Sequence, residues 1–118
     1  MEPSRSLSGR PLADGGAGMN WDTDYQKGRA AFEKGDYVTA LREWAPLAAQ
    51  GYALAQFHLG LLYSEGRGVP QDYVQALKWT RLAAEHGEAN AQYNLGVMYA
   101  EAKGVSRDYV QALKWHRL

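Results

Sequence analysis

The sequence DYVQALKWTRL at residues 72–82 returns as DYVQALKWHRL at residues 108–118, and the two copies differ only at Thr80 and His116. The similarity extends upstream of both copies. Residues 36–71, aligned with residues 72–107 without a gap, are identical at 16 of 36 positions. Self-similarity at a fixed period of roughly 20–50 residues is the signature of a fold built from stacked supersecondary units. The period therefore decides the interpretation of the rest of the chain.

Each period contains two helical patterns. In the first, helix A, apolar residues recur at the spacing of one helical face. They are Ala91, Leu95, Met98, Tyr99 and Ala102 in the later copy. In the second, helix B, the residues of the apolar face are Ala76, Leu77, Thr80, Ala83 and Ala84. No segment alternates with a period of two, so we predict no strand.

Glycine and aspartate residues mark where these helices end and begin. Gly68 and Gly104 are expected to adopt the left-handed backbone that ends helix A, and Gly87 does the same for helix B. Asp72 and Asp108 precede helix B and are good N-caps. The alternation of caps and apolar faces predicts antiparallel helix pairs.

At 118 residues the chain is one ordinary domain at most. Residues 1–20 are rich in Gly, Pro and Ser and have no aromatic residue, which predicts a disordered tail or a vector remnant. We expect a helical repeat domain over residues 21–118, with units at 21–51, 52–87 and 88–118, the last one truncated. The inter-helix turn of the first unit is four residues shorter than in the later units, with helices at about residues 22–33 and 37–49.

The motif over residues 53–69, Ala-x-Ala-Gln-x-x-Leu-Gly-x-x-Tyr-x-x-Gly-x-Gly-Val, resembles the Sel-one-like repeat (SLR) family, and its second copy begins at Ala89. The first unit, with Gly28, Ala31, Ala40 and Trp44, is closer to the tetratricopeptide repeat. The resemblance implies an all-α, right-handed α-solenoid of about three antiparallel helix pairs, the last incomplete. It also implies an adaptor or scaffold role in assembling complexes.

Composition excludes several classes of function. The net charge is zero, with 13 basic and 13 acidic residues, so nothing indicates nucleic-acid binding. The absence of cysteine excludes a disulfide framework and thiolate metal sites. No apolar stretch reaches the roughly 18–20 residues of a membrane span, so we expect no membrane insertion. The compartment stays open: cytoplasmic or, if a leader has been removed, periplasmic or secreted.

No catalytic or cofactor motif is recognisable. The three histidines lie 28 and 30 residues apart, far from the i, i+4 spacing of paired metal ligands on a helix, so we predict no metal site and no cofactor. There is neither a Gly-x-Ser-x-Gly motif nor a cysteine, and we expect a protein that is not an enzyme. The alternative is a β-lactamase-like hydrolase, as described for cysteine-rich SLR relatives, whose cysteines this chain lacks.

The face of helix A that the core leaves unused carries aromatic, amide and charged side chains. Because solenoids stack their A helices along the concave side, we expect these faces to form one surface that binds a partner protein or peptide. The predicted partner-binding residues are Tyr25, Arg29, Phe57, His58, Asn90, Tyr93, Asn94 and Glu101. Tyr93 and Phe57 could instead pack between adjacent helices, and Asn90 and Asn94 could be merely solvated.

A further alternative is weak association between copies of the chain. The last helix is expected to end at Leu118, which leaves the apolar side of Trp115 and Leu118 incompletely covered. Uncapped repeat ends expose apolar surface that another copy can cover.

Overall fold

The computed structural model describes residues 21–103, 105 and 108–116, so the predicted tail, Gly104 and Leu118 lie outside the described residues. All regular structure in the described part of the chain is helical. The helices are α2 (Trp21–Glu33), α3 (Tyr37–Ala49), α4 (Ala53–Glu65), α5 (Tyr73–Glu85), α6 (Ala89–Glu101) and α7 (Tyr109–His116). The first pair falls within one residue of the predicted bounds.

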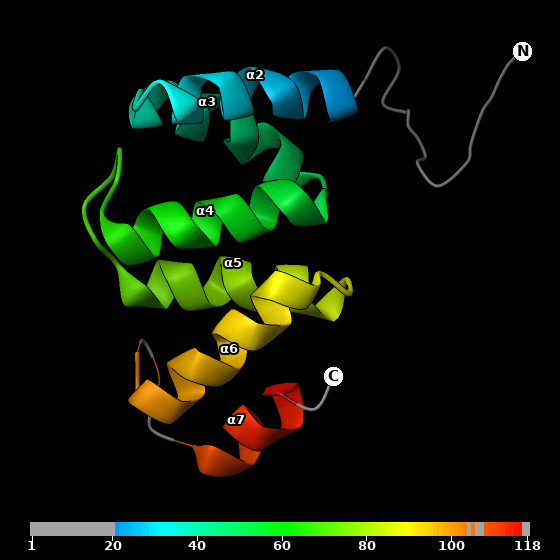
Figure 1. Ribbon diagram of the computed structural model, residues 1–118, viewed down its shortest axis with the longest axis vertical. Coiled ribbons are helices and arrows are strands. Elements are labelled where there is room, and N and C mark those ends of the chain that lie inside the picture. The colour runs from blue at the N-terminus through cyan, green and yellow to red at the C-terminus, as the bar shows by residue number, and fades with distance from the viewer. Residues whose placement is uncertain (1–20, 104, 106–107, 117–118) are drawn as a thin grey trace, which may run out of the picture.

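The helices stack in chain order along the long axis of the molecule (Figure 1). Each helix packs mainly against its neighbours in sequence, and the stack measures 50 × 30 × 18 Å. Helices α2, α4 and α6 are the A helices of the repeats, and α3, α5 and α7 are the B helices. The prediction of an all-α repeat solenoid is confirmed.

Caps at both ends of helix B follow the sequence prediction. The Asp72 carboxylate accepts hydrogen bonds from the backbone N–H groups of Val74 and Gln75 at 3.0 and 3.1 Å. At the other end Gly87 has a φ of 90°. Its N–H group donates to Ala84, and the next N–H donates to the carbonyl of Ala83, which is the Schellman arrangement.

Helix A ends two residues earlier than predicted. The left-handed residues that end α4 and α6 are Gly66, with a φ of 66°, and Ala102, with a φ of 59°. Gly68 also has a positive φ, but it serves a contact between repeats: a Cβ there would lie 2.8 Å from the backbone of Tyr37. Gly68 therefore lets the loop after α4 lie against the start of α3, and the expectation that it ends the helix was wrong.

One close contact between helices A and B recurs in every repeat. Gly28 faces the ring of Trp44, Gly60 faces Thr80, and Gly96 faces His116. At each site an added Cβ would collide with the facing side chain. Because the glycine has no side chain, the two helices approach closely, and the facing residue on helix B sets what fills the space between them.

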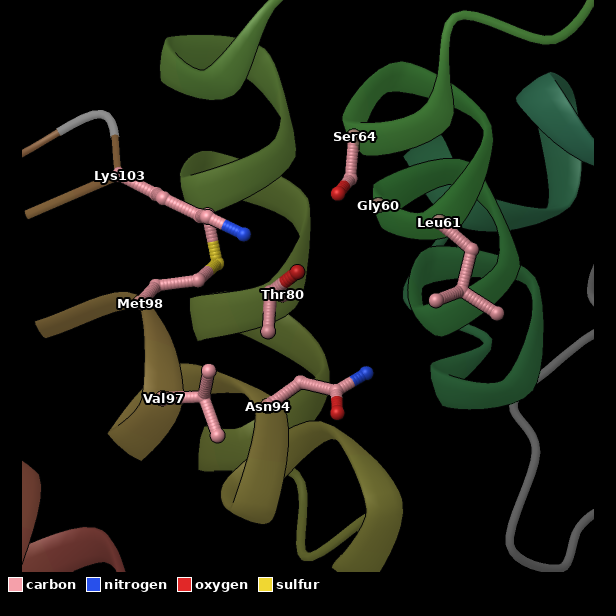
Figure 2. Close-up of a pocket in the computed structure, with 8 residues that line it drawn as sticks. All are labelled: Gly60, Leu61, Ser64, Thr80, Asn94, Val97, Met98 and Lys103. Atoms are coloured by element: carbon pink, nitrogen blue, oxygen red, sulfur yellow. The ribbon is translucent and has the colours of Figure 1, made fainter. Parts of the chain in front are cut away.

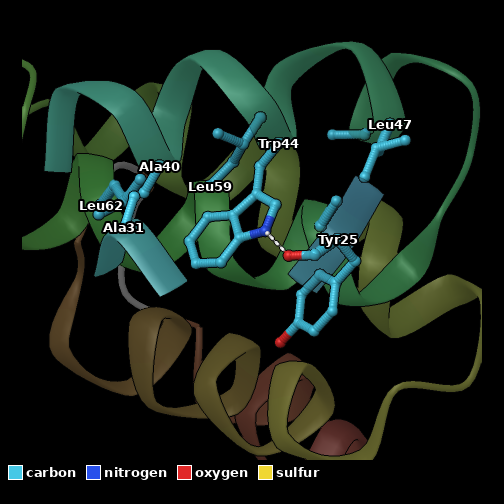
Figure 3. Close-up of a cluster of buried hydrophobic side chains, with 9 residues drawn as sticks. Tyr25, Ala31, Ala40, Trp44, Leu47, Leu59 and Leu62 are labelled. Carbon is cyan, nitrogen blue, oxygen red and sulfur yellow. Dashed lines mark hydrogen bonds between the residues drawn. The ribbon is translucent and has the colours of Figure 1, made fainter. Parts of the chain in front are cut away.

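The largest fully buried side chain of the described residues is Trp44, which lies in the first core cluster (Figure 3). Its Nε1 donates to the backbone carbonyl of Tyr25 at 3.0 Å. Side-chain hydrogen bonds connect successive repeats. The buried Gln56 amide donates to the Ala48 carbonyl at 3.1 Å, and the Gln92 amide donates to the Ala84 carbonyl one repeat later. These bonds satisfy carbonyls at the C-terminal ends of α3 and α5.

Replacing Gly28 with alanine is expected to destabilise the protein by about 1–3 kcal/mol, because the new methyl group overlaps a buried indole that cannot move aside. Gly60→Ala is the matched variant. The added Cβ lies 2.5 Å from the Thr80 hydroxyl oxygen, which can move aside when the side chain rotates. Gly60→Ala should therefore lower the free energy of unfolding by less than Gly28→Ala does, and adding Thr80→Ala should recover the loss. Urea unfolding measures both. Equal stability of Gly28→Ala and the native chain would contradict this account.

Ala102→Gly is expected to raise the free energy of unfolding by about 1 kcal/mol, since glycine adopts the left-handed backbone without the Cβ strain of alanine. Gly66→Ala, at the equivalent position of the previous repeat, should lower the free energy of unfolding by a similar amount. Thermal unfolding of both variants provides the measurement. A destabilised Ala102→Gly protein would show that the strain does not exist.

Candidate functional site

A pocket of about 190 Å³ lies between α4 and α6 (Figure 2). Helix α4 contributes Gly60, Leu61 and Ser64 to its lining, and α5 contributes Thr80. The remaining lining residues are Asn94, Val97 and Met98 of α6 and Lys103, which follows that helix. Two successive A helices thus form its walls, with the helix B between them.

The pocket combines an apolar wall with polar groups that converge on it. Val97 and Met98 supply the apolar side, and Ser64, Thr80 and Asn94 supply two hydroxyls and an amide. The Asn94 amide points from α6 into the space toward α4 (Figure 2), and it has no hydrogen-bond partner among the residues that the structure describes. Such a mixture suits recognition of a ligand group by shape and a few hydrogen bonds.

Lys103 is the one charged residue in the described lining, and its charge is already paired. Its Nζ lies 3.0 Å from the carboxylate of Glu101 and 5.5 Å from the centroid of the Tyr73 ring. The hydrogen bond to Glu101 raises the pKa of Lys103 above its usual value. The ammonium group therefore stays protonated at neutral pH and cannot remove a proton from Ser64.

The equivalent space one repeat earlier, between α2 and α4, is filled by rings. Phe32, Trp44 and His58 occupy the repeat positions of Ser64, Thr80 and Asn94. The centroids of the Trp44 and His58 rings are 4.6 Å apart, and those of the Phe32 ring are 5.8 and 6.1 Å from them. Three mutually touching rings therefore stand where the later repeat has three small polar side chains.

His58 holds this first space together, although sequence reasoning placed it on the side of helix A away from the core. Its Nε2 lies 2.8 Å from the Tyr25 hydroxyl, and its ring stacks on Trp44. Its Nδ1 is buried with no hydrogen-bond partner among the described residues. Burial, with a smaller effect from the charge of Arg29, lowers the pKa of His58 from 6.5 to about 4.

The structure separates the predicted partner-binding residues into two groups. Tyr25 is only 4% exposed and belongs to the core, so we correct its assignment to the binding surface: its ring packs beside Trp44 and its hydroxyl bonds His58. His58 and Phe57 are half-buried and in contact with each other, with ring centroids 5.1 Å apart. Tyr25 and His58 join α2 to α4, whereas Phe57 packs against the buried cluster that includes Ala83 and Leu95.

The remaining predicted residues are accessible. Asn94 lines the pocket, while Asn90 and Glu101 are exposed on the same helix. Tyr93 is 63% exposed and stacks on His116 of α7, with ring centroids 5.1 Å apart. The other exposed residue is Arg29, which pairs with Glu33 at 2.9 Å.

Sequence reasoning missed Ser64, Thr80, Met98 and Lys103. Thr80 was assigned to the core face of helix B, and the structure does bury it, but its position faces the pocket. A signal was present in the repeat alignment, where Thr80 replaces Trp44. A small residue in place of a large buried one leaves space unless its neighbours grow.

The described residues were also compared with the requirements of a metal site and of a membrane span. Within residues 21–103, 105 and 108–116, no three His, Cys, Asp or Glu side chains gather as a metal site would require. None of the described helices has the length and apolar content to cross a bilayer. Association of two copies through the apolar side of Trp115 and Leu118 stays a prediction, since Trp115 is half-buried and Leu118 lies outside the described residues. Elsewhere on α7, Val110 and Leu113 are 77% and 53% exposed.

Comparison with known proteins places the chain among helical repeat proteins. The family model for the Sel1 repeat matches residues 53–88 and 89–118. No curated protein matches the chain. Among solved structures, the chain is similar to the protective antigen c5321 of uropathogenic Escherichia coli strains, which displays an SLR fold. The TM-score is 0.78 and the identity 35%, over 89% of this chain and 23% of the antigen.

A Sel1 repeat protein from Oxalobacter formigenes is also similar, with a TM-score of 0.74 and 35% identity over 80% of this chain and 38% of that protein. The chain therefore spans about a quarter to two fifths of the length of these two proteins.

The stability of the protein is expected to fall as pH drops from about 6.5 to about 4. In that window the unfolded chain binds a proton at residue 58 that the folded chain, with the lowered pKa of His58, does not bind. The loss should be on the order of 2 kcal/mol, allowing for partial solvent screening. Urea unfolding at several pH values measures it.

His58→Asn is the matched control, because Asn94 occupies this position in the next repeat and does not titrate. The native chain should lose stability relative to this variant between pH 6.5 and pH 4. A difference between the two proteins that stays constant across the window would contradict the assignment.

Proposed function

The chain belongs to the Sel1 repeat family, whose members are generally protein-interaction scaffolds, and we propose that it binds a partner protein or peptide on the surface formed by its A helices. The proposal assigns no chemical step to the protein. Its role is to hold a partner, as an adaptor does within a larger assembly.

The observation that carries the proposal is the pocket between α4 and α6. Both walls come from A helices, so the surface that the repeat pattern predicts is hollowed rather than flat at this point. Asn94 offers an amide without a partner among the described residues, and peptide backbones supply both donors and acceptors for such a group. A pocket with an adjoining accessible face is typical of an anchor site within a larger interface.

The surroundings of the pocket support the proposal as well. Tyr93 and Asn90 lie on the same helix as Asn94 and are exposed, so a partner that reaches the pocket can also contact an aromatic ring and a second amide. Aromatic side chains supply large contact area at low conformational cost, which is why they are enriched at interfaces.

The pocket gives little support to the hydrolase alternative. It holds two hydroxyls, those of Ser64 and Thr80, but its described lining includes no histidine. Lys103 could act as a base only with a lowered pKa, whereas its pairing with Glu101 raises the pKa. A nucleophile without a base is not activated, so the proposal remains one of binding.

The test is a pull-down from the source cell that compares the native chain with the double variant Asn90→Ala/Asn94→Ala. The double variant is expected to lose a partner that the native chain retains, because it removes both amides from the α6 face. Loss of one interface hot spot weakens binding by about 2 kcal/mol or more, roughly thirtyfold. Mass spectrometry of the retained proteins provides the measurement.

Lys78→Ala/Glu85→Ala is the control, since both residues are exposed on α5 and neither pair of substitutions changes the net charge. This control should retain the same partner as the native chain. Equal recovery by all three proteins would contradict binding through the A-helix surface.

A further inference from the structure

The pocket between α4 and α6 has a filled counterpart within the same molecule. In the space between α2 and α4, the Trp44 ring lies on Gly28 and stacks against His58, and Phe32 completes the set of rings. In the space between α4 and α6, the glycine is kept as Gly60, so the backbones still approach closely. The pocket is therefore the same space without its aromatic contents.

The protein itself shows how a ring is held in such a space. The flat face of the Trp44 indole rests against a glycine of helix A, and its polar edge donates to the backbone carbonyl of Tyr25. Phe57 occupies the position of Tyr25 in the next repeat. In the second space Gly60 lines the pocket, and the small Thr80 side chain lies against it in place of an indole. Ser64, Thr80 and Asn94 supply two hydroxyls and an amide for a polar edge.

We propose that this pocket receives an aromatic side chain of a peptide partner, one with a hydrogen-bonding group on its ring, that is, a tyrosine or a tryptophan. The inference rests on the proposed function and names the chemistry of its ligand. The partner supplies from outside the ring that Trp44 supplies within the chain one repeat earlier. Met98 and Val97 contact the ring, and Ser64, Thr80 and Asn94 bond its polar edge.

The charges at the pocket favour this ligand over an acidic one. Lys103 is the cation of the described lining, and it already pairs with Glu101 at 3.0 Å. A carboxylate ligand would bring a second negative charge close to Glu101. An aromatic ring adds no charge, and the thioether of Met98 makes favourable contacts with ring edges.

The first test uses NMR spectra of the full native chain titrated with four probes. These are N-acetyl-tyrosinamide, N-acetyl-tryptophanamide, N-acetyl-phenylalaninamide and N-acetyl-leucinamide. The tyrosine and tryptophan probes are expected to shift the Asn94 side-chain amide and the Met98 methyl signal, and to bind about three- to tenfold more tightly than the leucine probe. The phenylalanine probe, which has no hydrogen-bonding group on its ring, should bind more tightly than the leucine probe and more weakly than the tyrosine and tryptophan probes.

The Trp44 Nε1 signal is the internal control, because the space around it is filled and should not respond to any probe. Equal or tighter binding of the leucine probe, or shifts confined to other parts of the chain, would overturn the proposal.

The second test fills the pocket from within. Thr80→Trp/Asn94→His transplants two of the three rings beside the retained Gly60, and it should weaken binding of the tyrosine probe at least about tenfold without lowering the unfolding temperature. Ser64→Phe places the third ring on the opposite wall and makes the same test if the double variant does not fold. Undiminished binding by a folded variant would overturn the assignment of the ring to this pocket.

The inference and the function it rests on can fail separately. Loss of the partner by Asn90→Ala/Asn94→Ala, together with no preference for aromatic probes, overturns the inference and leaves the proposed function standing. A clear aromatic preference, with the partner still retained by that variant, supports the ligand class and contradicts the wider binding surface.

Discussion

The close approach of a helix A glycine to one residue of helix B governs the rest of this structure. Without a Cβ at Gly28, Gly60 and Gly96, the two helices of each repeat come together until the facing side chain fills the gap. Van der Waals attraction falls off steeply with separation, so this spacing determines how well each pair packs. The facing residues differ sharply in size, from Trp44 to Thr80 to His116, while the glycine stays the same.

The helix-to-helix contacts are the same in successive repeats, whereas the side chains between the helices differ. This explains why the space between α2 and α4 is part of the core and the space between α4 and α6 is a pocket. The contacts recur in register: the Gln56 and Gln92 amides bond the preceding helix B, and the Arg67 and Lys103 side chains lie over Tyr37 and Tyr73. These bonds do not depend on the size of residue 44 or 80. The protein can therefore lose a ring at one repeat without losing the alignment of the helices around it.

The sequence predicted helix positions well because the repeat supplies each signal more than once. Bounds within one residue at α2 and α3 followed from caps and apolar spacing, which are local properties of the backbone. The end of α4 was placed two residues late, because Gly66 and Gly68 both have a positive φ and only packing against Tyr37 distinguishes their roles. His58 was placed toward solvent because the ring that covers it, Trp44, comes from another helix.

The sequence alone determined the class of fold and the order of the helices, since period, caps and helical spacing are properties of neighbouring residues. It also contained the exchange of Trp44 for Thr80, but the consequence of that exchange depends on what else enters the space. Only the tertiary structure decided that Ser64, Thr80 and Asn94 meet around one pocket, while Tyr25 and His58 turn inward. The reason is physical: whether a side chain is free to bind depends on the volume left by residues from three different helices, and no local pattern records that volume.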